Sequence, residues 1–260
     1  MVRTAVQAIL FDLDETLILE KPIAIKALEQ TGQRANAVAG VHPPELRDRV
    51  LERAGELWRS TPAIDYCRRV GISSWEGLWA GFAGEDENLV WLREWAPTYR
   101  FESWSRALKD LGVDDERLAR ILADEFVETR TGLFERFPET IEILDELEGA
   151  VRLVLATNGA SDLQRLKLET SGLTDYFDDV LVSADIGFAK PHPIFYENAI
   201  RLANAGPEQI LMVGDNIRRD IGGAQEAGIR GIWVNRKDRD PGEIQPFAEI
   251  ENLFELRNFL

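Results

Sequence analysis

Cysteine and histidine are scarce in this sequence, and their scarcity argues against two kinds of stabilisation. Among 260 residues there are one cysteine, Cys67, and two histidines. A lone cysteine cannot form an intrachain disulfide, so the fold has to rest on packing, as is usual in a reducing cytosol. The sequence also lacks the cluster of histidine and cysteine ligands that would favour a zinc site. We expect Cys67 to be a partly buried structural thiol.

Long apolar runs are also missing. No stretch approaches the roughly 18 consecutive apolar residues that a membrane-spanning helix needs, and the N-terminal apolar run is too short for a signal peptide. Low-complexity tracts and internal repeats are absent from the sequence. We therefore expect a cytoplasmic protein without a membrane partner.

Positive charge is the third shortage. There are 30 lysine and arginine residues against 46 aspartate and glutamate residues, which gives a formal net charge of -16. Binding to a nucleic-acid backbone needs basic surface that displaces counterions, so a DNA or RNA partner is not expected. With 45% hydrophobic and 29% charged residues, the chain has an ordinary globular composition. Its length allows one large domain, or a core domain that carries an inserted module.

Helices and short β-branched runs alternate from residue 137 onward. This alternation predicts a doubly wound α/β domain with a mainly parallel sheet. The apolar run 6–11 has to add a further strand, because one strand alone cannot bury its faces. Ser161 and Gln164 are spaced as a capping box that would open one of the helices. The expected strands are 151–156, 179–183, 210–213 and 231–234, and the expected helices are 138–147, 161–171, 192–204 and 219–227.

Strand patterns are scarce between residues 18 and 135. Helical periodicity is clear at 44–60 and at 114–129, where Leu118, Ile121, Leu122 and Phe126 share one face, and Pro97 and several glycines mark breaks between shorter pieces. A segment of this size is longer than any ordinary connection. We therefore predict a mostly helical cap at 18–135, inserted into a catalytic core formed by 1–17 and 136–260.

The insertion contains six of the seven tryptophans. Aromatic rings bury much apolar area, so these side chains are expected to form the core of the insertion itself. Trp75 and Trp79 are the candidates to face a substrate instead, since they are four residues apart and are followed by Gly81 and Gly84.

Polar side chains follow the predicted strands at the point where each strand ends. In an open parallel sheet, ligands bind outside the carboxyl ends of the strands, so these side chains are expected to share one rim. Asp12 and Asp14 repel each other and call for a cation, and Mg²⁺ prefers such oxygen ligands. An aspartate beside a lysine can also attack phosphorus to give an acyl-phosphate. The side chains concerned are Asp12, Asp14, Thr157, Asn158, Lys190, Asp215, Asn216 and Asp220.

The order and strand context of these residues resemble the four motifs of the haloacid dehalogenase-like (HAD) hydrolase superfamily, one branch of which places a helical cap after the first motif. The resemblance implies a Rossmann-like core and a Mg²⁺ cofactor. It implies that Asp12 is the nucleophile and a Mg²⁺ ligand, and that Asp14 is the general acid and base and binds the metal through its backbone carbonyl. Thr157 and the backbone of Asn158 would bind the phosphoryl oxygens, and Lys190 would pair with both the nucleophile and the phosphoryl group. Asp215 would be a further Mg²⁺ ligand, Asp220 would support the metal site or orient Lys190, and Asn216 would be a further supporting residue.

The presence of Asp14 distinguishes between two reactions of this superfamily, dehalogenation and hydrolysis of a phosphate ester. Members that resemble haloacid dehalogenases lack this second carboxylate, because a halide leaving group needs no proton, whereas an alkoxide does. We therefore expect a Mg²⁺-dependent phosphatase acting on a small soluble phosphate monoester through an aspartyl-phosphate. A phosphomutase of the same family is one alternative, and a receiver-like signalling protein is another. The substrate stays open among nucleotides, sugar phosphates and sugar-acid phosphates, and the protein is expected to be a monomer or homodimer.

Overall fold

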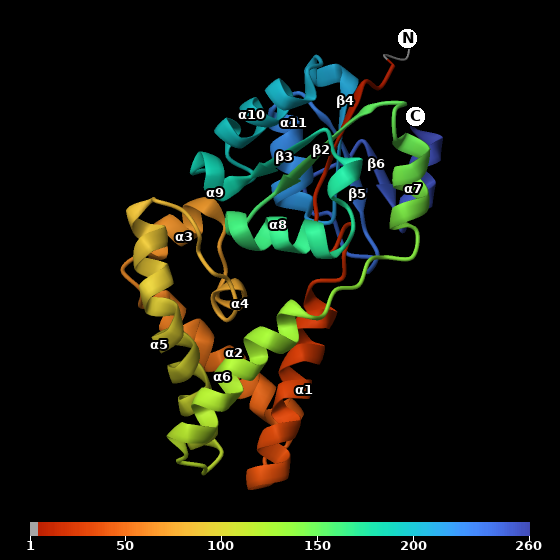
Figure 1. Ribbon diagram of the computed structural model, residues 1–260. Coiled ribbons are helices and arrows are strands. Elements are labelled where there is room, and N and C mark those ends of the chain that lie inside the picture. The colour runs from red at the N-terminus through yellow and green to blue at the C-terminus, as the bar shows by residue number, and fades with distance from the viewer. Residues whose placement is uncertain (1–4) are drawn as a thin grey trace. The chain divides into compact units, whose positions relative to one another are not determined.

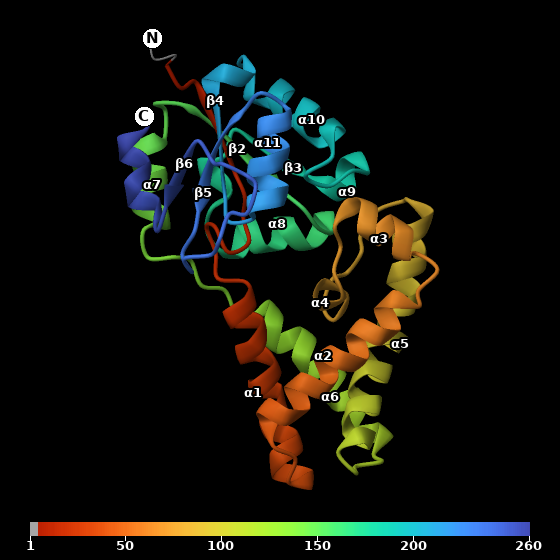
Figure 2. The ribbon, with the colours of Figure 1, turned by 180° about the vertical axis from the view of Figure 1, so that it is seen from behind.

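The computed structural model describes residues 5–260, and the ribbon is shown from two opposite sides in Figures 1 and 2. Met1 to Thr4, which the sequence assigns to the core, lie outside the described residues. The chain divides into two units. The first, here called the core, comprises residues up to Leu19, Glu135–Asn158 and Gln164–Leu260, and the second, here called the cap, comprises Glu20–Phe134 with Gly159–Leu163.

The core is built on one parallel sheet of six strands in the order β3-β2-β1-β4-β5-β6. This confirms the predicted doubly wound, parallel α/β fold. The third position in this order belongs to β1, so the first strand of the chain is central in the sheet. The strands are β1 (Ala8–Phe11), β2 (Arg152–Thr157), β3 (Asp179–Val182), β4 (Ile210–Gly214), β5 (Arg230–Val234) and β6 (Ala248–Ile250).

Every residue of β1 is buried, because helices cover both faces of the sheet. Ile9 and Phe11 point into an apolar cluster with α7 (Thr140–Leu147), α8 (Ser161–Thr170) and the 3-10 turn η4 (Leu253–Asn258). Ala8 and Leu10 point into a second cluster, with α10 (Pro193–Ala203) and α11 (Gly223–Glu226). Alternate residues of one short strand thus join two hydrophobic layers.

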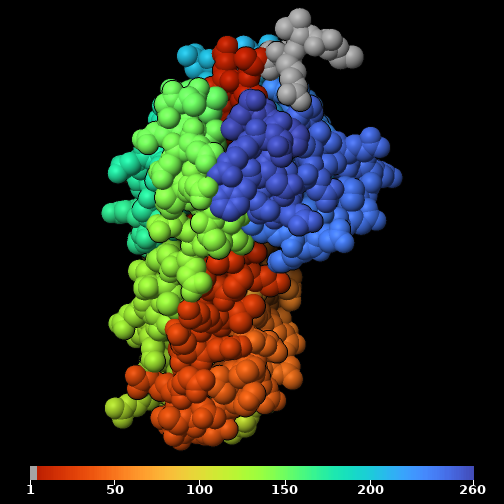
Figure 3. Space-filling view, turned by 90° about the vertical axis from the view of Figure 1, so that its right-hand side faces the viewer, coloured from red at the N-terminus to blue at the C-terminus, as the bar shows by residue number. Residues whose placement is uncertain are grey.

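The C-terminal turn η4 closes the first of these layers. In Figure 3 it is the dark blue segment lying against the green segment that contains α7. Arg257 fastens the two together at the surface, with Nε 2.8 Å from Glu146 Oε2 and Nη2 2.7 Å from Glu142 Oε1. The remaining short core elements are η1 (Thr174–Tyr176), α9 (Ser183–Ile186), η2 (Pro207–Gln209) and the π-helical turn η3 (Ile217–Gly222).

Two details of the core differ from the sequence-based prediction. The helix expected over 219–227 is instead the π-helical turn η3 followed by α11. Gly223, the first residue of α11, lets the chain approach Pro191 closely, since a Cβ there would lie 2.9 Å from the Cα of Pro191. The strand β6 was not predicted, because its three residues are too few to show a periodic pattern.

The cap is helical throughout, as predicted, and within residues 20–134 it contains no strand. The helices α1 and α2 pack together, as do α2 and α5, α5 and α6, and α1 and α6, so the four long helices form a closed bundle. The helices of the cap are α1 (Lys21–Ala39), α2 (Pro43–Arg59), α3 (Ile64–Val70), α4 (Ser74–Gly77), α5 (Glu87–Asp110) and α6 (Glu116–Thr131).

Aromatic side chains pack together within this bundle, and Trp58, Trp79 and Trp104 are buried, as expected of the cap's own core, whereas Trp75 is half-buried and its contact with a substrate stays a prediction. The ring of Trp58 lies 5.3 Å from that of Tyr99, 6.0 Å from Trp95 and 6.3 Å from Phe82, measured between centroids. Trp79 is only 5% exposed, and the guanidinium of Arg130 lies 4.1 Å from its ring centroid. Trp79 is therefore a packing residue.

Two expectations about the cap were wrong. Pro97 does not break a helix but lies inside α5, where it faces solvent, so the helix hydrogen bond that proline cannot make is lost on the wet side. Ile121 was assigned to the buried face of its helix but is 37% exposed, whereas Leu118, Leu122 and Phe126 are buried. Cys67 is a free thiol, as expected, and it is fully rather than partly buried. In the part of the chain that the structure describes, the membrane-span criteria of length and apolarity are met by none of the helices.

Candidate active site

Asp12 directly follows β1 and lies at the centre of the site. Its backbone N-H donates to the Val213 carbonyl at 2.9 Å, so the parallel ladder between β1 and β4 holds the residue in place. Its side chain is 12% exposed. Thr16 adds a contact from the following turn, since its hydroxyl lies 3.5 Å from Asp12 Oδ2. Asp12 Oδ2 is therefore contacted from the turn that follows β1, and Oδ1 is the oxygen that Lys190 contacts.

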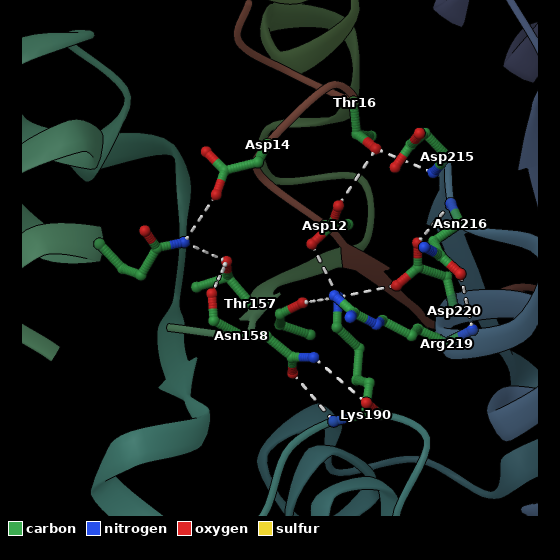
Figure 4. A network of polar contacts seen from close by, with 12 residues as sticks. Asp12, Asp14, Thr16, Thr157, Asn158, Lys190, Asp215, Asn216, Arg219 and Asp220 are labelled. Atoms are coloured by element: carbon green, nitrogen blue, oxygen red, sulfur yellow. Dashed lines mark hydrogen bonds and ion pairs between the residues drawn. The ribbon is translucent and has the colours of Figure 1, made fainter. Parts of the chain in front are cut away.

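Lys190 reaches Asp12 from the loop between α9 and α10. Its Nζ lies 2.7 Å from Asp12 Oδ1, 2.8 Å from Asp220 Oδ1 and 2.6 Å from the Ala156 carbonyl (Figure 4). Burial alone would lower the pKa of Lys190, but the two carboxylates outweigh burial and hold it above its ordinary value. The lysine is therefore a fixed positive charge shared between two aspartates.

Asn158 holds the backbone of Lys190. Its Oδ1 accepts from the Lys190 N-H at 2.9 Å, and its Nδ2 donates to the Lys190 carbonyl at 3.2 Å. This paired contact joins the end of β2 to the lysine loop. The side chain of Asn158 is thus a scaffold for Lys190, which leaves the predicted contact of its backbone with a phosphoryl oxygen as a prediction.

Three carboxylates collect at the edge of the sheet. Asp12, Asp215 and Asp220 each offer one oxygen, and these oxygens lie within 4.8 Å of one another. Burial raises the pKa of Asp12 to about 8, with Asp220 and Asp215 adding to the rise and Lys190 opposing it. Burial, followed by the charge of Asp220, raises the pKa of Asp215 to about 6. Three acids with one buried lysine leave an excess of negative charge, and an all-oxygen set of donors suits a hard cation such as Mg²⁺.

Asp215 is oriented by neighbours that the motifs do not include. Its N-H donates to the Thr16 hydroxyl at 3.0 Å, and its carbonyl accepts from the indole N-H of Trp233 at 2.8 Å. Arg239 donates to the same carbonyl at 2.6 Å and lies 3.2 Å from Asp215 Oδ2. The Arg239 side chain is 43% exposed, so solvent weakens this ion pair.

The turn after β4 places Asp220. Asn216 caps the π-helical turn through its Oδ1, which accepts from the N-H groups of Arg218 and Arg219 at 3.2 and 3.0 Å. Asp220 Oδ2 accepts from the Asn216 N-H at 2.9 Å, leaving Oδ1 for Lys190. Gly214 leaves room for the Asp220 side chain, because a Cβ at position 214 would lie 2.3 Å from Asp220 Oδ2.

Asp14 faces a different set of partners from Asp12. Its two oxygens each lie 3.0 Å from the Nζ of Lys167, and Oδ2 also accepts from Gln164 Nε2 at 3.1 Å. The same amide nitrogen donates to the Thr157 hydroxyl at 2.6 Å. Gln164 Oε1 is buried without a hydrogen-bond partner among the described residues, so the predicted capping box is wrong.

All of the sequence-predicted residues stand at the carboxyl edge of β1, β2 and β4 or in the loops beside it. Asp12, Lys190, Asp215 and Asp220 form one cluster, and Asp14 joins Thr157 through Gln164. Sequence reasoning missed Gln164, Lys167 and Arg239. Gln164 and Lys167 are three residues apart on the helix that follows Thr157, and this spacing on one helix face was the signal available.

Comparisons with known proteins agree with this arrangement. A family model described as haloacid dehalogenase-like hydrolase matches residues 6–228. The phosphoserine phosphatase of Thermus thermophilus is 36% identical over 251 residues, which cover 95% of this chain and 96% of that protein.

Two solved structures show the same fold. The HAD-hydrolase YfnB from Bacillus subtilis, bound to magnesium, superposes with a TM-score of 0.68 over 98% of this chain and 99% of its own, at 24% identity. A 2-haloacid dehalogenase from Pseudomonas syringae pv. Tomato DC3000 gives a TM-score of 0.60 over 97% of each chain, at 29% identity. The chain belongs to the haloacid dehalogenase-like hydrolases.

Proposed function

We propose that this hydrolase is a Mg²⁺-dependent phosphatase that cleaves a small phosphate monoester through an aspartyl-phosphate on Asp12. The observation that carries the proposal is the position of Lys190, whose Nζ bonds Asp12 at 2.7 Å beside two further carboxylates. This arrangement combines a nucleophile with a fixed positive charge for the phosphoryl oxygens. The similarity to a phosphoserine phosphatase over nearly the whole chain supports the same reaction.

Asp12, Asp215 and the carbonyl of Asp14 are the groups proposed to hold Mg²⁺, with Asp220 beside them. The buried excess of negative charge and the absence of nitrogen or sulfur donors from the acidic cluster fit this ion. When bound, Mg²⁺ would offset the charge of the phosphoryl oxygens and of the aspartates.

In the first step, a carboxylate oxygen of Asp12 attacks phosphorus, and the bond between phosphorus and the ester oxygen breaks. Asp14 gives a proton to the departing oxygen, so the product leaves as an alcohol. Lys190 stays paired with Asp12 and holds the charge that develops on the phosphoryl oxygens, together with the Thr157 hydroxyl. The result is an acyl-phosphate on Asp12.

In the second step, Asp14 as a carboxylate takes a proton from water, and the water oxygen attacks phosphorus. The bond between phosphorus and the Asp12 oxygen breaks, which releases inorganic phosphate and restores the carboxylate. The same residue therefore serves as acid and then as base. The presence of Asp14 favours a phosphate ester over a haloacid, although a haloacid dehalogenase shares the fold.

The first substrate class to test is the phosphorylated amino acids, because of the phosphoserine phosphatase relative. The experiment measures phosphate release from a panel of phosphoserine, phosphothreonine, nucleoside monophosphates, sugar phosphates and sugar-acid phosphates, with Mg²⁺ and with a chelator. A 2-haloacid is included, with halide release as its readout. We expect Mg²⁺-dependent release from at least one phosphate ester and none from the haloacid.

Asp12→Asn is the decisive variant, and Asp185→Asn is its matched control, since Asp185 takes part in an exposed ion pair with Arg165. We expect the first to lose turnover and the second to retain it. Turnover by Asp12→Asn at the wild-type rate would overturn the proposed nucleophile. A stable phosphorylated protein without phosphate release would favour a signalling role, and transfer of the phosphoryl group to an added sugar would favour a phosphomutase.

A further inference from the structure

Helix α8 sends two side chains toward the site, and the mechanism above uses neither. Gln164 and Lys167 are 0% and 1% exposed, and both contact Asp14. They are one helical turn apart, so they lie side by side on the same face of α8. Arg165 of the same helix, by contrast, forms an exposed ion pair with Asp185 of α9.

Lys167 is a buried ammonium group, and a buried charge is expensive unless it is paired. Asp14 supplies such a pair, with both carboxylate oxygens 3.0 Å from Nζ. The equal distances fix the direction in which the carboxylate points, and the contact of Gln164 Nε2 with Oδ2 restricts its rotation. A side chain that is 29% exposed is thereby held in one orientation.

Gln164 connects Asp14 to Thr157, because its side-chain NH₂ group donates hydrogen bonds to both. A carboxylate can only accept hydrogen bonds, so the amide must present its NH₂ group to Asp14 Oδ2, and its second N-H then points at the Thr157 oxygen. The Thr157 hydroxyl accepts this bond, and its own contact as donor, to the Asn158 carbonyl, is 3.5 Å long and at the limit for a hydrogen bond. Its hydrogen is therefore available to a ligand oxygen.

We propose that Lys167 and Gln164 are positioning residues: Lys167 fixes the Asp14 carboxylate for proton transfer, and Gln164 turns the Thr157 hydroxyl into a donor for the phosphoryl group. This inference rests on the proposed phosphatase function. It predicts different kinetic defects for the two residues. Loss of Lys167 affects only steps that need Asp14, whereas loss of Gln164 also weakens phosphoryl binding.

Leaving-group dependence distinguishes such a role from a purely structural one. A p-nitrophenolate ion leaves without needing a proton, but an alkoxide depends on the general acid. Lys167→Met should therefore lower kcat/KM for the best alkyl phosphate of the panel by roughly tenfold or more, while p-nitrophenyl phosphate changes by less than about threefold. The control Arg165→Met, on the same helix, should leave both values unchanged.

The effect should depend on Asp14. On an Asp14→Asn background, Lys167→Met is expected to cause little further loss with the alkyl phosphate, because residues that act as a unit are not additive. Gln164→Leu should raise KM for both esters and add the selective loss with the alkyl ester. Equal losses for the two esters with Lys167→Met, or full additivity with Asp14→Asn, would overturn the inference.

Stability has to be followed in parallel, since both side chains are buried. If Lys167→Met does not fold, Lys167→Gln and Gln164→Leu are to be compared by the same leaving-group ratio and by their melting temperatures in the absence of substrate. A failure of the proposed function is distinguishable: the wild type would then release no phosphate, or Asp12→Asn would remain active. If the wild type is active and Asp12→Asn is inactive, but Lys167→Met lowers kcat/KM equally for both esters, only the positioning role of Lys167 is wrong.

Discussion

Lys190 Nζ lies 2.8 Å from Asp220 Oδ1, in an ion pair whose two side chains are 2% and 1% exposed. The same ammonium group bonds Asp12 at 2.7 Å. The ammonium group of Lys190 therefore forms ion pairs with two buried carboxylates, Asp12 and Asp220. Removing the lysine and removing one of the acids should consequently have unequal effects on stability.

Lys190→Met should destabilise the metal-free protein by about 3–5 kcal/mol, because it leaves two buried carboxylates without their cation. Asp220→Asn should cost less, since the lysine keeps Asp12 and one repulsion between acids disappears. Urea unfolding in the presence of a chelator measures both. A greater loss for Asp220→Asn than for Lys190→Met would show that the lysine is not the shared charge.

Mg²⁺ should stabilise the protein more at high pH than at low pH. The pKa values of Asp12 and Asp215 are raised to about 8 and about 6 from 3.8 in the absence of metal. Between the ordinary and the raised pKa values the folded state binds more protons than the unfolded chain, so the metal-free protein loses stability as pH rises through this window. A cation that needs the ionised acids competes with those protons at low pH.

The measurement is the rise in melting temperature on adding Mg²⁺ at about pH 6 and about pH 8.5, where linkage predicts the larger rise at the higher pH. Asp215→Asn is the comparison, since it removes one ligand and should reduce the rise at both pH values. An equal rise at the two pH values in the wild type would contradict the assigned titration.

Gly214→Ala should destabilise the protein by about 1–3 kcal/mol through overpacking. The added Cβ would lie 2.4 Å from the carboxyl carbon of Asp220, so either the strand or the aspartate must move. Gly132→Ala is the control, because its nearest neighbour, the Glu128 carbonyl oxygen, would be 3.6 Å away. We expect the control to be neutral or slightly stabilising, as judged by thermal unfolding.

Pro97→Ala should stabilise the cap by about 1–2 kcal/mol. Proline in the interior of α5 cannot donate to the carbonyl of Arg93, and alanine restores that bond, while the freer unfolded chain offsets part of the gain. Thr98→Ala, at the exposed neighbouring position, is the control for helix propensity. A lower melting temperature for Pro97→Ala would mean that packing of Trp95 and Tyr99 depends on the proline.

The parallel sheet could be predicted because its strands are short, fully buried apolar runs followed by polar residues. Asp12 and Asp14 could be identified in this way, since Val6 to Phe11 ends at the first of them. The role of Lys167 could not, because a lysine on a helix is usually solvated, and only the three-dimensional fold shows that it is buried beside Asp14.

The continuity of α5 was missed for a similar reason. A proline is a local break signal, and its cost is outweighed here by the rings of Trp58, Trp95 and Tyr99, which pack together from two helices. The π-helical turn η3 was missed because the acidic and glycine residues that shape it also suit an ordinary helix start. In both places the local sequence is compatible with two structures, a broken or continuous helix at Pro97 and an ordinary helix or π-helical turn at η3, and tertiary contacts decide between them.

The position of β1 in the sheet has a consequence for synthesis of the protein. Ala8 pairs with Arg152 and Ile210, so β1 is synthesised before the cap and finds its two neighbours only after the whole cap has been made. The cap can fold meanwhile from contacts between nearby helices, whereas the apolar β1 has to wait and is a natural target for chaperones. A nascent chain therefore has no complete acidic cluster until Asp220 has emerged.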